Sequence, residues 1–426
     1  MDRANEVSTH KGLTVFSPVN TVYYILFFLF YNFHFMRTTM FYNEYWCDYY
    51  DQFVYYYDIA YKVLMGLAVV SVLFVIDRFR YKLLAVALVA VSLLYNHYRE
   101  VTAFPAILVF FLLLICSWGK SYKKIGIITL VCGTGWLIAC YIGSKVGYIS
   151  DIVYRNGGSH SFGTIYSTDL MCHILTLVMV YLILRKGKLK IWEYGFGFLI
   201  LLFNMQYLQA KVGFGCLVLL MAGTFYYQYI APRKDLRGLL TEKTFKAASL
   251  SFIIFAVLMI VLTLLYTPDP RLPVNSIRFL KTVKLRFIYG KQAFEDYPIT
   301  LWGTYIRERG NGGVQGGTIS DSEYFFLDIS YVRILMKDGV VVFTAIMTVF
   351  LVAQVRLFKQ KQYYIMFILF IFALDCAIEH HMMEIAYSFF AYFAFCTPEP
   401  VVRAEEPAEV PSVLPIVSGA IPGNIA

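Results

Sequence analysis

Long apolar runs, separated by short polar segments, dominate the pattern of this chain of 426 residues. A run of about 20 mostly apolar residues is long enough to cross the hydrocarbon core of a bilayer as a helix. We therefore expect an all-α, polytopic integral membrane protein with about twelve transmembrane helices, within a range of about 10 to 13. The predicted spans are residues 17–35, 54–76, 83–97, 101–118, 125–143, 169–184, 191–208, 212–230, 248–266, 336–355, 363–379 and 382–396.

The positions of Lys and Arg between these runs predict the orientation of the chain. Alternate short loops carry eighteen basic residues, and the intervening short loops carry only Arg37, Arg99, Lys145, Arg155 and Lys211. Cytoplasmic loops of membrane proteins are enriched in Lys and Arg. The asymmetry predicts that both termini are cytoplasmic. The basic loops lie around residues 78–82, 120–124, 185–190, 233–246 and 356–361.

The composition agrees with a membrane protein. Hydrophobic residues make up 59% of the chain and charged residues only 15%, whereas soluble domains carry about a quarter charged residues. A net charge of +9 would suit nucleic acid, but the basic residues gather between apolar runs, so we expect no nucleic-acid partner. The eight cysteines form no CxxC pair, and the sequence therefore indicates neither a zinc site nor a disulfide framework.

We divide the chain into a single membrane domain, residues 1–396, and a disordered cytoplasmic tail, residues 397–426, which is rich in Pro, Val and Glu. Within the membrane domain, residues 267–323 form a large extracytoplasmic loop before the last three spans. Apolar and basic positions alternate over residues 277–294 of this loop. That pattern predicts an amphipathic helix at the outer headgroup level.

Three arginines on the predicted outer side are candidates for binding an anion: Arg155, Arg278 and Arg286. A guanidinium is always charged, and its planar fork of donors matches phosphate oxygens. The three together could hold a diphosphate. The alternatives are an ordinary outer loop with one interfacial arginine, and plain attraction to lipid headgroups.

Carboxylates at membrane depth are costly unless they are paired or functional. Asp328 has apolar residues on both sides and could act as a general base, although a capping role at the start of a helix is the alternative. Glu379 is followed by His380 and His381, with Glu384 just beyond, and two adjacent histidines with two glutamates invite a metal-site interpretation. Adjacent residues point to different faces of a helix, and zinc proteases use an i, i+4 spacing. We therefore predict no metal site and an ion pair between Glu379 and an arginine.

Taken together, these clusters resemble the Wzy-type polysaccharide polymerases, the family that polymerises O-antigen and exopolysaccharide repeat units. Members show an arginine before a Ser-Leu/Phe-Gly motif, then an arginine followed by a Tyr-Pro…Gly segment. An Asp-Asn-x-Tyr motif with a later glycine and a final glutamate follow. The matching residues here are Arg155 with Ser161-Phe162-Gly163, Arg286 with Tyr297, Pro298 and Gly303, Asp328 with Tyr331 and Gly339, and Glu379.

The chain departs from this family at four positions. Ser167-Thr168 stands where many members have Pro-Asn, Ile329 replaces the asparagine, and Lys211 stands where an arginine is frequent. The related lipid-linked O-antigen ligases usually have a histidine where this chain has Asp328.

The resemblance implies a GT-C-like membrane glycosyltransferase of the bacterial cytoplasmic (inner or plasma) membrane. Such an enzyme transfers a polyprenyl-diphosphate-linked glycan to the non-reducing end of another lipid-linked repeat unit on the outer face. It uses no metal or other cofactor, and a chain-length regulator protein is a candidate partner. The implied site residues are Arg155, Arg278, Arg286 and Lys211 for the diphosphate, Asp328, then Glu323 or His160, as the base, and Glu379 and Tyr331 for orientation.

Three other functions are compatible with a multi-pass membrane protein: a flippase or transporter for lipid-linked oligosaccharides, an O-antigen ligase-like transferase, and a non-catalytic scaffold. Transporters tend to show internal repeats and charges in the middle of helices. This chain shows no convincing repeat, and its charges concentrate at junctions between loops and helices. The pattern favours an enzyme with an outer site.

Overall fold

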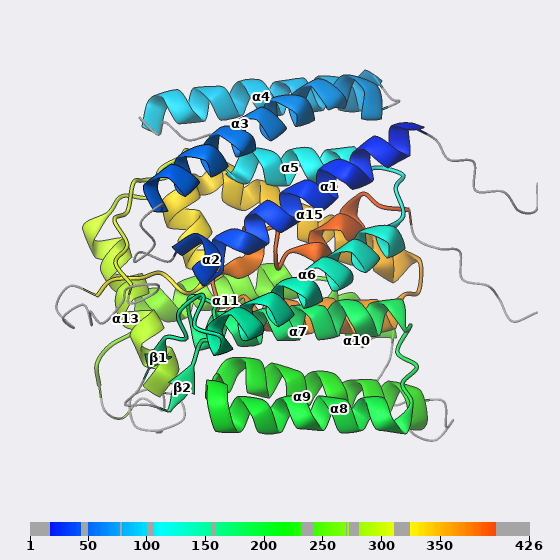
Figure 1. Ribbon diagram of the computed structural model, residues 1–426, viewed down its shortest axis with the longest axis vertical. Coiled ribbons are helices and arrows are strands. Elements are labelled where there is room, and N and C mark those ends of the chain that lie inside the picture. Colours follow the sequence, from blue (N-terminus) through cyan, green and yellow to red (C-terminus); the bar gives the residue numbers. More distant parts are fainter. Residues whose placement is uncertain are drawn as a thin grey trace, which may run out of the picture.

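The computed structural model describes residues 18–43, 50–76, 79–99, 106–154, 158–231, 242–269, 271, 281–310 and 324–397. Within these ranges the regular elements are helices, apart from one short antiparallel hairpin of two strands, and irregular segments connect them. Figure 1 shows the long helices running side by side across the molecule.

The first part of the described chain contains the hairpin and seven of the helices. They are α1 (Pro18–Arg37), α2 (Met40–Asn43), α3 (Tyr50–Val75), α4 (Phe79–Arg99), α5 (Ala106–Cys116), α6 (Tyr122–Lys145), β1 (Val153–Tyr154), β2 (Ser159–His160) and α7 (Ser167–Leu184).

The second part of the described chain contains further α-helices together with short π-helical and 3₁₀ segments, both of which carry the label η. The elements are α8 (Ile191–Phe203), η1 (Asn204–Leu208), α9 (Lys211–Phe225), η2 (Tyr226–Ile230), α10 (Glu242–Ala248), α11 (Ser251–Leu265), α13 (Lys281–Asp296), α14 (Ser330–Arg333), η4 (Ile334–Asp338), α15 (Gly339–Lys359), α16 (Tyr363–Asp375), η5 (His381–Met383) and η6 (Phe389–Ala394).

Several of these helices are suited to a membrane. In the part of the chain that the structure describes, five helices are long and apolar enough to cross a membrane. A sixth candidate span results if α10 and α11, which meet at a bend of 53°, count as one broken helix. These findings support a multi-pass, all-helical membrane protein. The five helices are Gln52–Val72, Tyr122–Lys145, Ser167–Leu184, Lys211–Ile230 and Ser330–Lys359.

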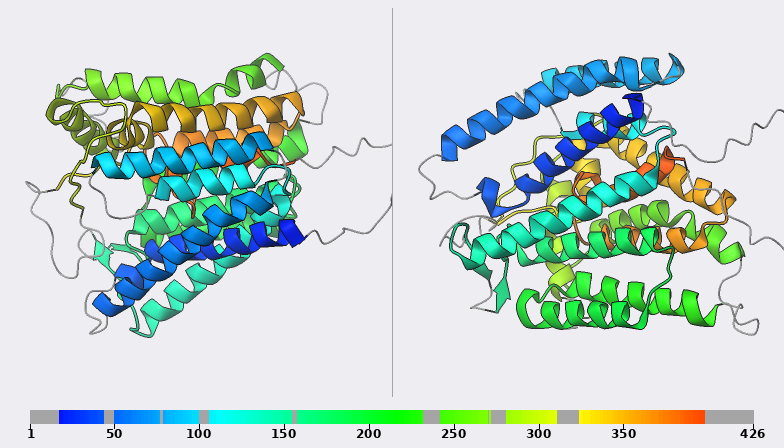
Figure 2. Two further views of the ribbon diagram at one scale, coloured as in Figure 1. Left: turned by 90° about the horizontal axis from the view of Figure 1, so that it is seen from above. Right: turned by 45° about the vertical axis from the view of Figure 1, so that its right-hand side comes forward.

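The two ends of the helix bundle differ. At one end, the backbone N–H of Thr397 donates to the carbonyl of Lys120, and Gly187 lies against Tyr364, so three loop regions that are rich in Lys and Arg meet there. The opposite end carries α2, the hairpin and α13, on the left of Figure 1 and also gathered at one end in Figure 2. The separation of basic loops from the α13 end follows the pattern seen in the sequence.

The last predicted span, residues 382–396, was predicted wrongly. Residues 382–396 do not form a transmembrane α-helix, because α16 ends at Asp375 and the chain returns through turns and the short 3₁₀ helices η5 and η6. Irregular backbone at membrane depth is tolerated where protein covers it. Here the side chains of η6 are buried, and the Arg356 Nη2 donates to the carbonyl of Cys396 at 3.0 Å.

The predicted amphipathic helix at residues 277–294 corresponds to α13, which begins at Lys281 and ends at Asp296. It packs against α11, and its Phe287 ring stacks on the ring of Tyr266, the residue that follows α11, with centroids 6.0 Å apart. Apart from Thr397, the predicted tail at residues 397–426 lies outside the described residues.

Candidate functional site

Arg286 lies on the buried side of α13. Arg286, Gly290 and Ala293 are spaced i, i+4 and i+7, which places them on one face of the helix. A Cβ atom at Gly290 would lie 2.8 Å from the Thr263 side chain, so the glycine allows α13 to approach α11 closely. The arginine is thereby carried into the protein, and its side chain is only 10% exposed.

The Arg286 guanidinium joins two carboxylates from distant parts of the chain. Its Nε donates to the carbonyl of Ile378 at 2.7 Å, and its Nη2 donates to Oε1 of Glu379 at 3.1 Å. The Oδ2 of Asp328 lies 3.6 Å from Nε. The ion pair expected between Glu379 and an arginine is therefore present, and Asp328 shares the same cation.

Burial sets the electrostatics of this cluster. It raises the pKa of Asp328, and the opposing effect of the Arg286 and Arg333 charges is smaller. A carboxylate with a raised pKa accepts a proton more readily than an ordinary aspartate.

Ser330 holds the backbone around both carboxylates. Its N–H donates to the carbonyl of Cys376 at 3.1 Å, and its hydroxyl donates to the carbonyl of Glu379 at 2.5 Å. The neighbouring Tyr331 is fully buried, and its hydroxyl donates to the carbonyl of Ala373 at 2.9 Å. Tyr331 thus contacts the backbone of α16, so any orienting role would act through the position of that helix.

A narrow cavity with a free volume of only about 10 Å³, roughly the space of one water molecule, lies beside this cluster. Arg286 and Glu379 line it together with Lys211, the first residue of α9. Three of the predicted site residues therefore share one cavity. Its other lining residues are Thr168, Cys172, Gln209, Ala210, Val212 and Gly213.

His160 belongs to a separate arrangement. Its Nδ1 lies 2.8 Å from Oδ2 of Asp151, and its ring stacks on Phe162 with centroids 5.2 Å apart. Asp151 also accepts a hydrogen bond from the N–H of Phe162 at 2.8 Å. The structure gives His160 a carboxylate partner of its own, outside the Arg286 cluster.

The Ser-Phe-Gly motif forms a tight turn. Phe162 and Gly163 have positive φ angles of 46° and 82°, a region in which glycine is favoured. A Cβ atom at Gly163 would lie 2.7 Å from the carbonyl oxygen of Cys140. The glycine therefore lets this loop lie directly on α6.

Two further motif glycines contact each other. Gly303 and Gly339 have φ angles of 82° and 86°, and a Cβ atom at Gly339 would lie 2.2 Å from the backbone nitrogen of Gly303. The Val340 N–H donates to the carbonyl of Thr300 at 3.1 Å. The glycine contact fixes the segment after α13 to the start of α15, and so relates Arg286 to Asp328.

Sequence reasoning did not single out two ionic groups of the structure. Glu308 accepts a hydrogen bond from Arg333 at 2.5 Å and pairs with Lys337. Asp169, in the first turn of α7, lies 3.6 Å from Nε2 of His381. Each acid is far from its partner in the sequence, so no local pattern marks these pairs.

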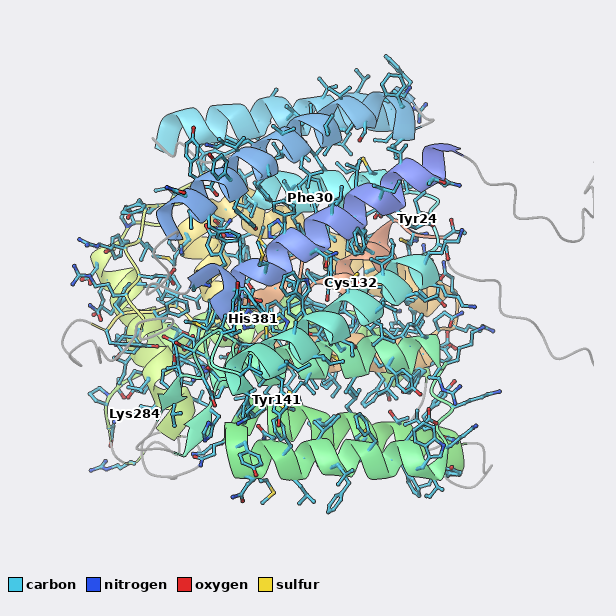
Figure 3. The ribbon with its side chains drawn as sticks, in the orientation of Figure 1. Tyr24, Phe30, Cys132, Tyr141, Lys284 and His381 are labelled. Atoms are coloured by element: carbon cyan, nitrogen blue, oxygen red, sulfur yellow. The ribbon has the colours of Figure 1, made fainter. Side chains whose placement is uncertain are left out.

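Two groups among the described residues have ligand atoms close enough to hold a metal ion. One is Cys172, Glu379 and His381, and the other is His380, His381 and Glu384. Figure 3 shows His381 inside the molecule, toward the end that carries α13, with Lys284 of α13 at that edge. Three other predicted site residues, Arg155, Arg278 and Glu323, lie outside the described residues.

Comparison with known protein families, with curated proteins and with solved structures finds no match to this chain.

Proposed function

We propose that this chain is a membrane glycosyltransferase that polymerises glycans carried on a polyprenyl diphosphate. The observation that carries the proposal is the buried Arg286 guanidinium between Asp328 and Glu379, beside a cavity that also exposes Lys211. The group lies at the α13 end, away from the basic loops. A lipid-borne substrate can reach such a site from the outer leaflet.

Each residue of the cluster has a chemical task in this reaction. Asp328 takes the proton from the acceptor hydroxyl, whose oxygen then forms a bond to the anomeric carbon of the donor glycan. The bond from that carbon to the diphosphate oxygen breaks, and its electron pair stays on the leaving diphosphate. Arg286 and Lys211 stabilise this developing charge, because they are already positioned before the reaction. Glu379 keeps the guanidinium in place.

The proposed architecture is a GT-C-like bundle that crosses the membrane about twelve times, with both termini in the cytoplasm. Residues 376–397 provide the last crossing, without an α-helix. The proposal is supported by the Lys120–Thr397 backbone contact at one end and the Ser330–Cys376 contact at the other. The bacterial cytoplasmic membrane is the location in which polyprenyl-diphosphate glycans would be available.

The test is an assay of purified protein in detergent with a synthetic polyprenyl-diphosphate oligosaccharide. We expect products that are longer by whole repeat units. Unchanged glycan in detergent, combined with movement of the same lipid across vesicles containing the protein, would instead establish a transporter. Transfer of a single glycan to a lipid-A core acceptor, without chain growth, would establish a ligase.

A further inference from the structure

The turn after α16 brings two histidines and a glutamate together inside the protein. His380 Nε2 lies 3.5 Å from Oε1 of Glu384, and His381 Nδ1 lies 3.1 Å from its Oε2. The two imidazole rings have centroids 4.0 Å apart. The side chains of His380 and His381 are 14% and 4% exposed and that of Glu384 is 37% exposed, so the two rings are shielded from solvent and the carboxylate lies at the edge of the group.

We predicted no metal site because adjacent residues point to different faces of an α-helix. Residues 379–384 are not α-helical, because α16 ends at Asp375 and His381 begins the short 3₁₀ helix η5. Adjacent side chains in this turn need not point to opposite faces. Both rings reach the same carboxylate, from positions i, i+4 and i, i+3 relative to Glu384.

The separations fit a coordinated ion. Zinc binds imidazole nitrogen at about 2.0–2.1 Å in tetrahedral geometry, which places neighbouring ligand atoms about 3.3 Å apart. The observed separations, 3.1 Å from His381 to Oε2 and 3.5 Å from His380 to Oε1 of Glu384, bracket that value, and one ligand atom from each of the three residues lies within 4.8 Å of the others. Hydrogen bonding alone would leave the 3.5 Å separation at the limit of contact.

The far nitrogen of each ring faces a second carboxylate. His380 Nδ1 lies 4.0 Å from Oδ1 of Asp328, and His381 Nε2 lies 3.6 Å from Oδ1 of Asp169. Neither ring nitrogen has a hydrogen-bond partner of ordinary length. Histidines that bind metal usually direct their other nitrogen to a carboxylate, which fixes the ring and raises its basicity.

We propose that His380, His381 and Glu384 bind one divalent transition-metal ion of the zinc class. The two histidines and the carboxylate supply three ligands and leave a fourth position open. Cys172, Glu379 and His381 are the other possible set, but Arg286 already engages Glu379 at 3.1 Å. The ion would anchor the turn that carries Glu379, while stabilisation of the leaving group stays with Arg286. The site does not depend on the proposed glycosyl transfer.

The first test uses the wild-type protein in detergent, stripped with a chelator and titrated with Co²⁺, whose visible absorption reports its ligands. We expect about one ion per chain and the strong visible bands of a four-coordinate site with nitrogen and oxygen ligands. An intense near-ultraviolet band from a cobalt–thiolate bond would assign the ion to Cys172 instead and overturn the proposal. Absence of any cobalt spectrum would also overturn it.

The second test compares zinc content after equilibration with a zinc buffer. His380→Gln and Glu384→Gln should lose the ion, and Asp169→Asn should weaken binding by about 10- to 100-fold because it removes only the outer carboxylate. His160→Gln is the matched control, since that histidine pairs with Asp151 elsewhere, and it should keep the ion. Equal zinc content in wild type and in soluble, monodisperse His380→Gln protein contradicts the site.

Discussion

Arg286 illustrates why the type of cation matters at this site. Its Nε and Nη2 donate in different directions, to a backbone carbonyl and to Glu379, and Asp328 lies close to the same edge. A planar guanidinium can serve all three because its donors are fixed in a fork. A lysine ammonium is a compact point charge on a flexible stem and cannot hold the same geometry.

Arg286→Lys should therefore reduce glycan elongation while the protein remains folded. We expect a fall of more than about 100-fold in rate, as for loss of a positioned transition-state donor. The measurement is elongation rate in detergent, with thermal unfolding in parallel. Arg307→Lys is the control, because Arg307 is an exposed arginine of the same loop. Equal rates for the two variants would remove Arg286 from the leaving-group role.

Asp328→Asn should slow elongation through the chemical step. An amide cannot accept the acceptor proton, and loss of a general base typically costs about 10²- to 10⁴-fold in rate. We expect kcat to fall with little change in KM. Asp151→Asn, which disrupts the partner of His160, should keep most of the activity. The opposite ranking of the two variants would make His160 the base.

At this scale the sequence predicted part of the site. The Glu379 ion pair followed from the cost of an unpaired buried charge, and Asp328 stood out because apolar residues flank it. The sequence placed Glu384 near His380 and His381 but argued against a metal site, and it could not place Asp169 there, because the contact between Asp169 and His381 joins distant parts of the chain. Nothing in the local pattern shows that α16 stops at Asp375.

Among the elements, the contact between Gly303 and Gly339 fixes α13 relative to α15. Both residues have positive φ angles, and a Cβ atom at Gly303 would lie 2.0 Å from the carbonyl oxygen of Lys337. The close approach leaves room only for the hydrogen atom that a glycine carries in place of a side chain. Any larger side chain would separate the two segments and with them Arg286 and Asp328.

Gly303→Ala should accordingly destabilise the fold by at least about 2 kcal/mol, from backbone strain and the steric clash together. Thermal unfolding in detergent measures the effect. Gly195→Ala is the matched control: Gly195 lies within α8 with open space around it, and alanine is the better helix former. A lower melting temperature for Gly195→Ala than for Gly303→Ala would contradict the packing account.

The helices differ in how far the sequence predicted them. Helices α3, α6 and α7 follow their apolar runs closely, because length and hydropathy decide a membrane helix. Residues 382–396 are equally apolar, yet they adopt 3₁₀ turns. Their backbone carbonyls find a partner in Arg356, and a long-range interaction of this kind leaves no mark on the local pattern.

For the whole molecule, the described basic loops around residues 120–124, 185–190 and 356–361 lie at the end of the bundle opposite α13. This polarity is what a site at the outer face requires. The sequence predicted it from the distribution of Lys and Arg, since that rule depends only on composition and order along the chain.

Cysteine labelling in intact cells tests this orientation. In a Cys47→Ser background, a cysteine at the exposed Tyr305 should react with a membrane-impermeant maleimide, and a cysteine at the exposed Lys188 should react only after permeabilisation. The two positions lie at opposite ends. The reverse labelling pattern would put the Arg286 cavity on the cytoplasmic face and exclude an outer-leaflet substrate.

The most direct test of the central claim measures the ratio of polyprenyl diphosphate released to glycosidic bonds formed. Purified protein is incubated with a lipid-diphosphate glycan, and both products are quantified by mass spectrometry. We predict one released lipid diphosphate for each bond formed by the wild type, and neither product from Arg286→Lys above background. Release without chain growth, or undiminished growth with Arg286→Lys, would contradict the proposal that Arg286 stabilises the diphosphate in a polymerisation reaction.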